Sequence, residues 1–254
     1  MTSETNDAPE VEVIVDETPQ SGLFNMSMDA ALLQLAMERE RSTVRIYQWT
    51  EPTVTLGYFQ GSGDSVESAF AGLPVVRRLS GGGAILHDQE ITYSLVLPAS
   101  HPARQDPSSV YEMVHRAIIE LLCNTGFPCQ LRSEYDEAGS LQSKTATAQT
   151  PEPFLCFLRK NPNDIVSQSG HKVVGSAQRR RKGVTLQHGS VLLRSSSYAP
   201  QVPGIADLMA DFRMNDFLKS LPQAIASVAG GISEFRGYTD EEKDLASSIA
   251  VDVA

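Results

Sequence analysis

The chain has 254 residues, enough for one large α/β domain or two small ones, and its 41% hydrophobic and 20% charged residues exclude a disordered chain. Its formal net charge of -10 disfavours nucleic acid and anionic lipid as general partners. No apolar run reaches the ~18 residues of a membrane span. The acidic start Met1–Glu17 does not resemble a signal peptide, and the three cysteines form no CxxC pair, so we expect a cytoplasmic protein with no membrane partner.

The first half of the chain predicts a tail followed by strands and a helix. Residues 1–10 are small, acidic and polar, so we expect a disordered tail, with a single domain over 11–254. The apolar stripe in Met28–Ala36 predicts a helix that Asn25 or Ser27 would cap. The predicted strands are Val11–Val15, Val44–Trp49, Thr53–Tyr58, Val75–Leu79 and Thr92–Leu97.

The second half alternates helices and strands. The capping box Ser109-x-x-Glu112 predicts the start of an amphipathic helix, and Gly126 is placed to end it. The polar stretch Gln142–Pro153 lacks periodicity and predicts a mobile loop. Val184–Leu193 predicts a strand. Two helical regions follow, one from about Ile205 and one capped by Thr239-x-x-Glu242.

A glycine-rich segment is the first candidate for chemistry: Arg77-Arg-Leu-Ser-Gly-Gly-Gly-Ala-Ile-Leu-His-Asp88. Three consecutive glycines let the backbone approach a ligand and present its N–H groups. The two arginines can hold an anion or a carbonyl-rich group. The pattern also fits a hairpin with a flexible turn and surface arginines, so it leaves both interpretations open.

A lysine and a basic run make the second candidate, in Gly170–Lys182. Lys172 is followed by small residues, so its ammonium could lie at the floor of a pocket and polarise a carbonyl. The alternative is a β-turn at Gly170 with a solvated lysine. The run Arg179–Lys182 is by default a solvated loop, but in an acidic chain it is also the best candidate for docking an acidic protein, which needs a locally basic patch.

A histidine and a cysteine make the last candidates. Polar residues interrupt the apolar strand around His188, which suggests a side chain that points into a pocket, although a lone histidine is more often structural. Cys156 lies between Phe154 and Phe157, which is typical of a small core residue. A nucleophilic cysteine is the alternative.

Together these segments resemble the lipoate–protein ligase and octanoyltransferase family, within the biotin/lipoate ligase superfamily. Arg77–Asp88 resembles its signature loop, and Lys172-Val-Val-Gly-Ser-Ala-Gln178 resembles its catalytic-lysine motif. Further blocks match in the same order: Asn25–Asp29, Arg45–Trp49, Pro52–Gly57, Gln60 and His188–Ser190. The resemblance implies one α/β (α+β) catalytic domain with mixed β-sheets flanked by helices, and an apolar acyl channel beside the glycine loop.

The resemblance also implies the site residues. Cys156 and Lys172 would be catalytic, and no metal site is implied. The expected substrate-binding residues are Arg77, Arg78, Ser80, Gly81, Gly82, Gly83, His87, Gly175, Ser176, Ala177, His188 and Gly189. Among them, His87 is expected to be a wall residue and not the main base.

Within the family, three features favour a cysteine octanoyltransferase. The segment Gln89–Ser94 is similar to that subgroup, as is Gln178-Arg-Arg-Arg181 followed by Leu186–Ser190. Cys156 lies upstream of the lysine motif, where single-domain octanoyltransferases carry their nucleophile. If this interpretation holds, the Cys156 sulfur should lie within about 6 Å of the Lys172 ammonium, because opposite charges at that range favour the thiolate.

The implied reaction moves octanoate, or lipoate, from acyl carrier protein to a lysine of a lipoyl domain or of glycine-cleavage H protein. It would pass through a Cys156 thioester and require no cofactor. One alternative is a lipoate–protein ligase that uses ATP and Mg²⁺, and another is a lipoyl-relay amidotransferase. A non-catalytic binding module is a third alternative. The resemblance favours a monomer.

Overall fold

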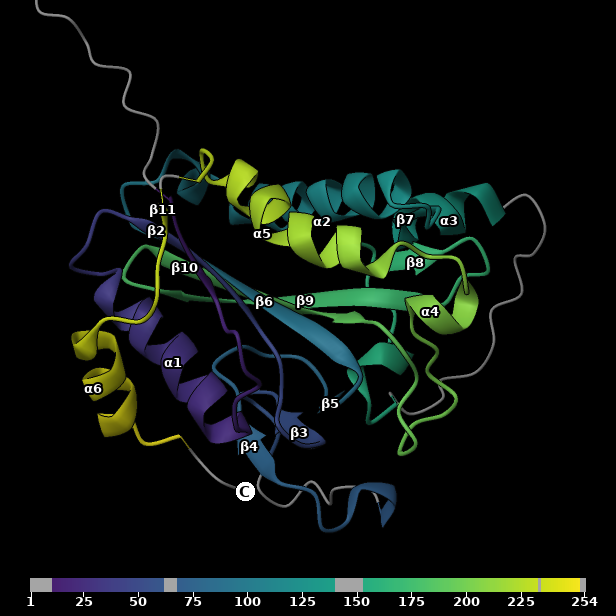
Figure 1. The fold of residues 1–254 in the computed structure, drawn as a ribbon, viewed down its shortest axis with the longest axis horizontal. Coiled ribbons are helices and arrows are strands. Elements are labelled where there is room, and N and C mark those ends of the chain that lie inside the picture. The colour runs from purple at the N-terminus through teal and green to yellow at the C-terminus, as the bar shows by residue number, and fades with distance from the viewer. Residues whose placement is uncertain (1–10, 62–67, 140–152, 233, 252–254) are drawn as a thin grey trace, which may run out of the picture.

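A large mixed β-sheet runs through the middle of the molecule (Figure 1), whose computed structural model describes residues 11–61, 68–139, 153–232 and 234–251. The predicted tail and most of the predicted loop Gln142–Pro153 lie outside these residues. In sheet order the strands are β11 (Glu234–Phe235), β1 (Val11–Val15), β2 (Ser42–Tyr47), β6 (Glu90–Leu97), β10 (Val184–Leu192), β9 (Lys172–Arg181), β8 (Ile165–Ser167) and β7 (Cys129–Leu131). β1 pairs in parallel with β2 and β11, and the remaining pairs are antiparallel.

A second, three-stranded sheet lies below the large one in Figure 1. It consists of β4 (Val75–Arg77), β3 (Thr53–Leu56) and β5 (Ile85–His87). The helices are α1 (Gly22–Leu35), α2 (Pro107–Asn124), α3 (Arg132–Gly139), α4 (Ile205–Leu208), α5 (Met214–Val228) and α6 (Asp240–Ser248), with short 3₁₀ turns η1 (Ser68–Phe70), η2 (Pro102–Gln105) and η3 (Cys156–Leu158).

Helices cover both faces of the large sheet. α2 and α5 pack together on one face, and α1 with α6 lie on the other (Figure 1). Because both faces are covered, the central strands β6 and β10 are buried along their whole length. One apolar cluster joins Ile118 of α2 to Leu221 of α5, and another joins Leu32 of α1 to Leu186 of β10. Each such buried side chain contributes roughly 1.5–3 kcal/mol of transfer free energy.

Two predicted helix starts were wrong, and one was confirmed. Helix α1 begins at Gly22, where Ser21 accepts a hydrogen bond from the Phe24 amide at 3.3 Å. Helix α2 begins at Pro107, because the Asp106 carboxylate accepts from two following amides and proline needs no N–H partner there. The capping box of Thr239 and Glu242 is present at α6 as predicted.

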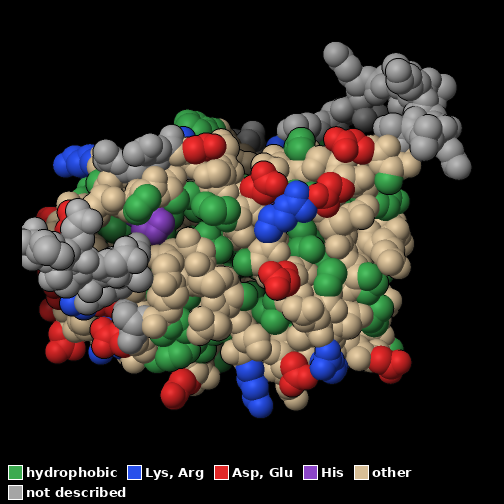
Figure 2. Space-filling model, turned by 90° about the horizontal axis from the view of Figure 1, so that it is seen from above, with side chains coloured by type: hydrophobic (Ala, Val, Ile, Leu, Met, Phe, Trp, Pro, Cys, Tyr) green, Lys and Arg blue, Asp and Glu red, His purple; other side chains and the backbone are tan. Residues whose placement is uncertain are grey.

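The helix end predicted at Gly126 was also confirmed. Gly126 has a φ of +108° directly after the cap residue of α2, a conformation that glycine adopts without strain. Among the described residues, the helices lack the combination of length and apolarity that crossing a membrane requires. On the face seen in Figure 2, acidic side chains are spread among basic and apolar ones.

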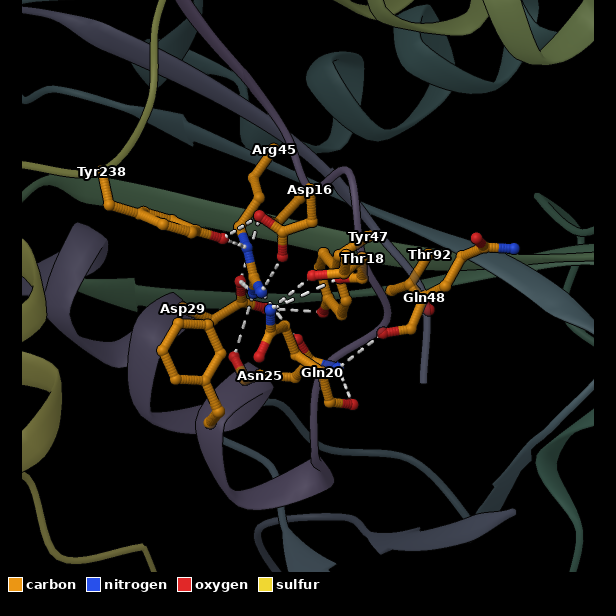
Figure 3. A network of polar contacts seen from close by, with 12 residues as sticks. Asp16, Thr18, Gln20, Asn25, Asp29, Arg45, Tyr47, Gln48, Thr92 and Tyr238 are labelled. Carbon is orange, nitrogen blue, oxygen red and sulfur yellow. Dashed lines mark hydrogen bonds and ion pairs between the residues drawn. The ribbon is translucent and has the colours of Figure 1, made fainter. Parts of the chain in front are cut away.

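A fully buried arginine ties α1 to the large sheet (Figure 3). Arg45 donates to Asp16 at 2.7 Å, to Asp29 at 3.2 Å and to the Asn25 side chain at 2.6 Å. Buried charges are costly unless they are paired, and here both carboxylates and the guanidinium have partners. The network fixes Asp29, whose other oxygen lies 3.3 Å from Nδ1 of His188. Arg45 therefore connects the core to the candidate site.

Candidate functional site

A cavity of about 220 Å³ has walls from both sheets and from α1. Met26 of α1 and Ile85 of β5 contribute apolar surface, while β9 and β10 contribute the opposite wall. Most of the predicted site residues meet here. Those that line the cavity are Arg78, Gly81, Gly82, Gly83, His87, Cys156, Lys172, Gly175, Ser176, Ala177, His188 and Gly189.

Two predicted substrate-binding residues do not line the cavity. The Arg77 guanidinium donates to the carbonyls of Gly57 at 3.1 Å and Gln60 at 2.6 Å, so it braces the turn after β3. Ser80 is buried, and its hydroxyl is hydrogen-bonded to Nε2 of His188. Arg77 and Ser80 therefore support the site from behind its wall.

Cys156 and Lys172 lie side by side in the cavity. The Lys172 Nζ is 3.9 Å from the Cys156 sulfur and donates to the Cys156 carbonyl at 3.2 Å. The Cys156 amide donates to the Ala84 carbonyl at 2.7 Å, which anchors η3 to the end of the glycine loop, and Lys172 meets η3 from the first position of β9. The separation falls within the 6 Å range expected for a thiolate stabilised by an ammonium.

Asp164 is a site residue that the sequence analysis missed. Its Oδ1 lies 2.9 Å from the Lys172 Nζ, and the two side chains are only 1% and 4% exposed. Burial raises the pKa of Asp164, while the Lys172 ammonium opposes that rise. The Asn161 amide donates to Oδ2 at 2.8 Å and orients the carboxylate. Asp164 thus holds the lysine beside the cysteine.

Arg78 braces the glycine loop from within the cavity wall. Its guanidinium donates to the carbonyls of Gly81 at 2.8 Å, Gly83 at 2.7 Å and Thr55 at 3.0 Å. Desolvation lowers the pKa of Arg78 to about 10, which leaves it charged at neutral pH. The arginine therefore uses one terminal nitrogen to hold the backbone of the loop and the other to hold β3.

Replacing Gly82 by valine is expected to weaken acyl binding on the order of tenfold. Gly82 has a φ of +98°, and a Cβ there would lie 3.0 Å from the Arg78 guanidinium. A β-branched residue in this conformation costs roughly 1–3 kcal/mol, so the loop should shift and narrow the cavity. Titration with octanoate and with lipoate measures the effect.

The matched control is Gly237→Val, because Gly237 has open space around it and no positive φ. That variant should bind both acids like the wild type. A melting curve shows whether Gly82→Val is folded. If the folded Gly82→Val protein binds both acids with wild-type affinity, the glycine loop is not part of the acyl-binding site.

His87 is locked in the cavity wall. Its Nδ1 lies 2.7 Å from Glu90 and its Nε2 lies 2.9 Å from Thr55, while the Trp49 ring stacks on it at 3.9 Å. Burial lowers the pKa of His87, which favours the neutral ring. A ring held on both nitrogens suits a wall residue.

Helix α2 supplies two further residues that the sequence analysis missed, Tyr111, which lines the cavity, and His115 behind it. The Tyr111 hydroxyl donates to the Ser176 carbonyl at 2.6 Å, and His115 contacts the Ser176 hydroxyl at 2.5 Å. His115 also bonds the Asn163 carbonyl through Nδ1, so this nitrogen carries the proton. Burial lowers the pKa of His115 to about 4, consistent with a neutral ring. The signal in the sequence was the spacing of four residues, which places Tyr111 and His115 on one side of a helix.

Comparison with known proteins finds one matching protein family and several similar proteins. The family described as the lipoyl protein ligase A/B catalytic domain matches residues 21–240. Octanoyltransferase LipM of Anoxybacillus flavithermus is 37% identical over 189 residues, which cover 72% of this chain and 66% of that protein. LipM of Bacillus subtilis is 34% identical over 186 residues, covering 70% and 64%. The matched region thus spans slightly under two thirds of these relatives' length.

Solved structures show the same fold at low sequence identity. A putative lipoate protein ligase from T. acidophilum with bound lipoic acid superposes with a TM-score of 0.70 at 20% identity, covering 94% of this chain and 93% of that chain. LipL1 of P. falciparum in complex with lipoate gives a TM-score of 0.62 at 15% identity, covering 94% and 71%. The predicted α/β fold with mixed sheets flanked by helices is confirmed.

Proposed function

The chain belongs to the family of lipoyl protein ligase A/B catalytic domains, and from that premise we propose that it is a protein octanoyltransferase. In this proposal octanoate, or lipoate, moves from acyl carrier protein to a lysine of a lipoyl domain or of glycine-cleavage H protein. The similar proteins named octanoyltransferase LipM support it. No cofactor takes part, because the donor thioester already carries the activation.

The contact between Cys156 and Lys172 carries the proposal. A thiolate is the nucleophilic form of cysteine, and a nearby ammonium stabilises it. The 3.9 Å separation places that ammonium beside the sulfur within the cavity wall. A cysteine that only fills space in a core would need no cation next to it.

The proposed reaction has two acyl transfers. The Cys156 thiolate attacks the carbonyl of the donor thioester, and the intermediate expels the carrier thiol, which takes up a proton. The acceptor lysine then attacks as a neutral amine, loses a proton to solvent, and releases the Cys156 thiolate. Lys172 can donate a hydrogen bond to the oxyanion that develops in each step. The ion pair with Asp164 keeps the ammonium in place between steps.

The ATP-dependent ligase is the second candidate. It would use Arg78 and the glycine loop to hold an adenylate, with Mg²⁺, and Cys156 would serve only as packing. Arg78, however, already donates both terminal nitrogens to backbone carbonyls. A guanidinium whose two terminal nitrogens are bonded in this way is poorly placed to make a bidentate contact with a phosphate. This observation favours the thioester route.

The test is transfer without ATP. The purified chain is incubated with octanoyl carrier protein and an acceptor lipoyl domain or H protein, with neither ATP nor Mg²⁺. We expect the acceptor to gain one octanoyl mass. Acylation that requires free acid and ATP would establish the ligase instead. Transfer from lipoylated H protein alone would establish the relay enzyme.

A further inference from the structure

Strand β9 leads from the cavity into a basic hairpin. Side chains alternate along a strand, so Ala177, Arg179 and Arg181 share one face of β9. Ala177 lines the cavity. The chain then reverses at Lys182 and Gly183, whose φ values of 50° and 86° suit a tight two-residue turn into β10. The end of β9 and the turn together carry four consecutive cations, Arg179–Lys182, which begin two residues beyond Ala177 of the cavity wall.

Among the residues that the structure describes, no acidic side chain forms an ion pair with the basic residues of this hairpin. In a chain of net charge -10, no aspartate or glutamate occurs between Asp164 and Asp207. Over the described ranges, none of the ion pairs involves Arg179–Lys182, and Arg180 bonds only to the neutral Gln178, at 3.2 Å. Arg236, by contrast, pairs with two buried glutamates. The hairpin is therefore a local positive field on an acidic protein.

Aromatic side chains connect the hairpin to the glycine loop. The Arg179 guanidinium lies over the Tyr58 ring, 4.6 Å from its centre, and Tyr58 meets Phe59 edge to face at 5.0 Å. A Cβ on Gly81 would touch Phe59 at 3.7 Å. Phe59 is 83% exposed, which is unusual for so large an apolar side chain. Exposed aromatic and arginine side chains are enriched at protein interfaces.

We propose that this surface, made of Tyr58, Phe59 and Arg179–Lys182 and here called the hairpin surface, docks the acidic acyl carrier protein that delivers the acyl thioester. The inference rests on the proposed function. Two acidic proteins repel each other at long range. A basic patch on one of them attracts the acidic surface of the other within the Debye length, which is about 8 Å at physiological salt. A carrier bound at the hairpin surface would present its prosthetic arm next to Gly81 and the cavity.

The test separates docking from chemistry with two donors. Arg181→Glu is made alone and together with Arg180→Glu, since both side chains are exposed and neither lines the cavity. We measure the Kd for the pantetheinylated, unacylated carrier, and acyl transfer from octanoyl carrier protein and from octanoyl-pantetheine. The double variant should weaken carrier binding and raise the carrier KM on the order of tenfold or more. The small donor should react as with the wild type, and kcat should be unchanged.

The matched control is Lys219→Glu, the same charge reversal at an exposed position of α5. This variant should bind the carrier and transfer the acyl group from both donors like the wild type. Unchanged carrier affinity in the double variant overturns the proposal, whether or not transfer occurs. An equal loss of transfer rate with both donors also overturns it. So does a loss of affinity that is confined to the acceptor lipoyl domain. A wild type that binds the carrier through this surface but accepts no acyl group from either donor would instead refute the proposed function and leave docking supported.

Discussion

Replacing Cys156 by serine is expected to abolish the acyl-enzyme. With octanoyl carrier protein and no ATP, the wild-type chain should gain one octanoyl mass that neutral hydroxylamine removes, because thioesters react with it far faster than amides. Cys156→Ser should show no adduct, since a serine hydroxyl is a far weaker nucleophile than a cysteine thiol or thiolate. Losing a nucleophile costs on the order of 10⁴–10⁶ in turnover. Mass spectrometry of the intact chain measures the adduct.

The other two cysteines provide matched controls. Cys123 is exposed on α2, and Cys129 lies on β7, where burial raises the pKa of its thiol. Neither lines the cavity, so Cys123→Ser and Cys129→Ser should acylate like the wild type. Acceptor modification that needs ATP and survives Cys156→Ser would contradict the thioester route and establish the ligase.

Removing the Lys172 ammonium is expected to slow acylation by about 10²–10³, the usual cost of losing one preorganised oxyanion donor. The structure adds a complication, because Lys172 is also the buried partner of Asp164. A lone Lys172→Met change would leave an unpaired buried carboxylate, which typically costs about 3–5 kcal/mol of stability. Single-turnover acylation and a melting curve must therefore be measured together.

The double variant Lys172→Met with Asp164→Asn separates stability from catalysis. It removes both charges, and an asparagine oxygen can still accept from the Asn161 amide. We expect this variant to melt closer to the wild type than Lys172→Met and to remain slow. Asp164→Asn alone keeps the ammonium and should lose much less rate. Near wild-type acylation by the folded double variant would show that Lys172 has no catalytic role.

Local signals in the sequence predicted several elements correctly. Short segments carried these signals, namely the alternation in Val11–Val15 for β1, the largely apolar run for β10 and the capping box at Thr239 for α6. Such signals need no distant partner to be recognised. Strand β5 was missed for the opposite reason. Three residues carry little periodicity, and Ile85–His87 becomes a strand only by pairing with Thr53–Thr55 of β3.

The sequence by itself also determined the family, because Arg77–Asp88 and Lys172–Gln178 are continuous motifs whose residue order is their signal. Only the tertiary structure decided which of two adjacent arginines faces the cavity. Consecutive side chains at the end of a strand point in opposite directions, so Arg78 lines the cavity and Arg77 braces a turn. The pairing of Asp164 with Lys172 depended likewise on how β8 and β9 meet, a contact between strands that no local pattern encodes.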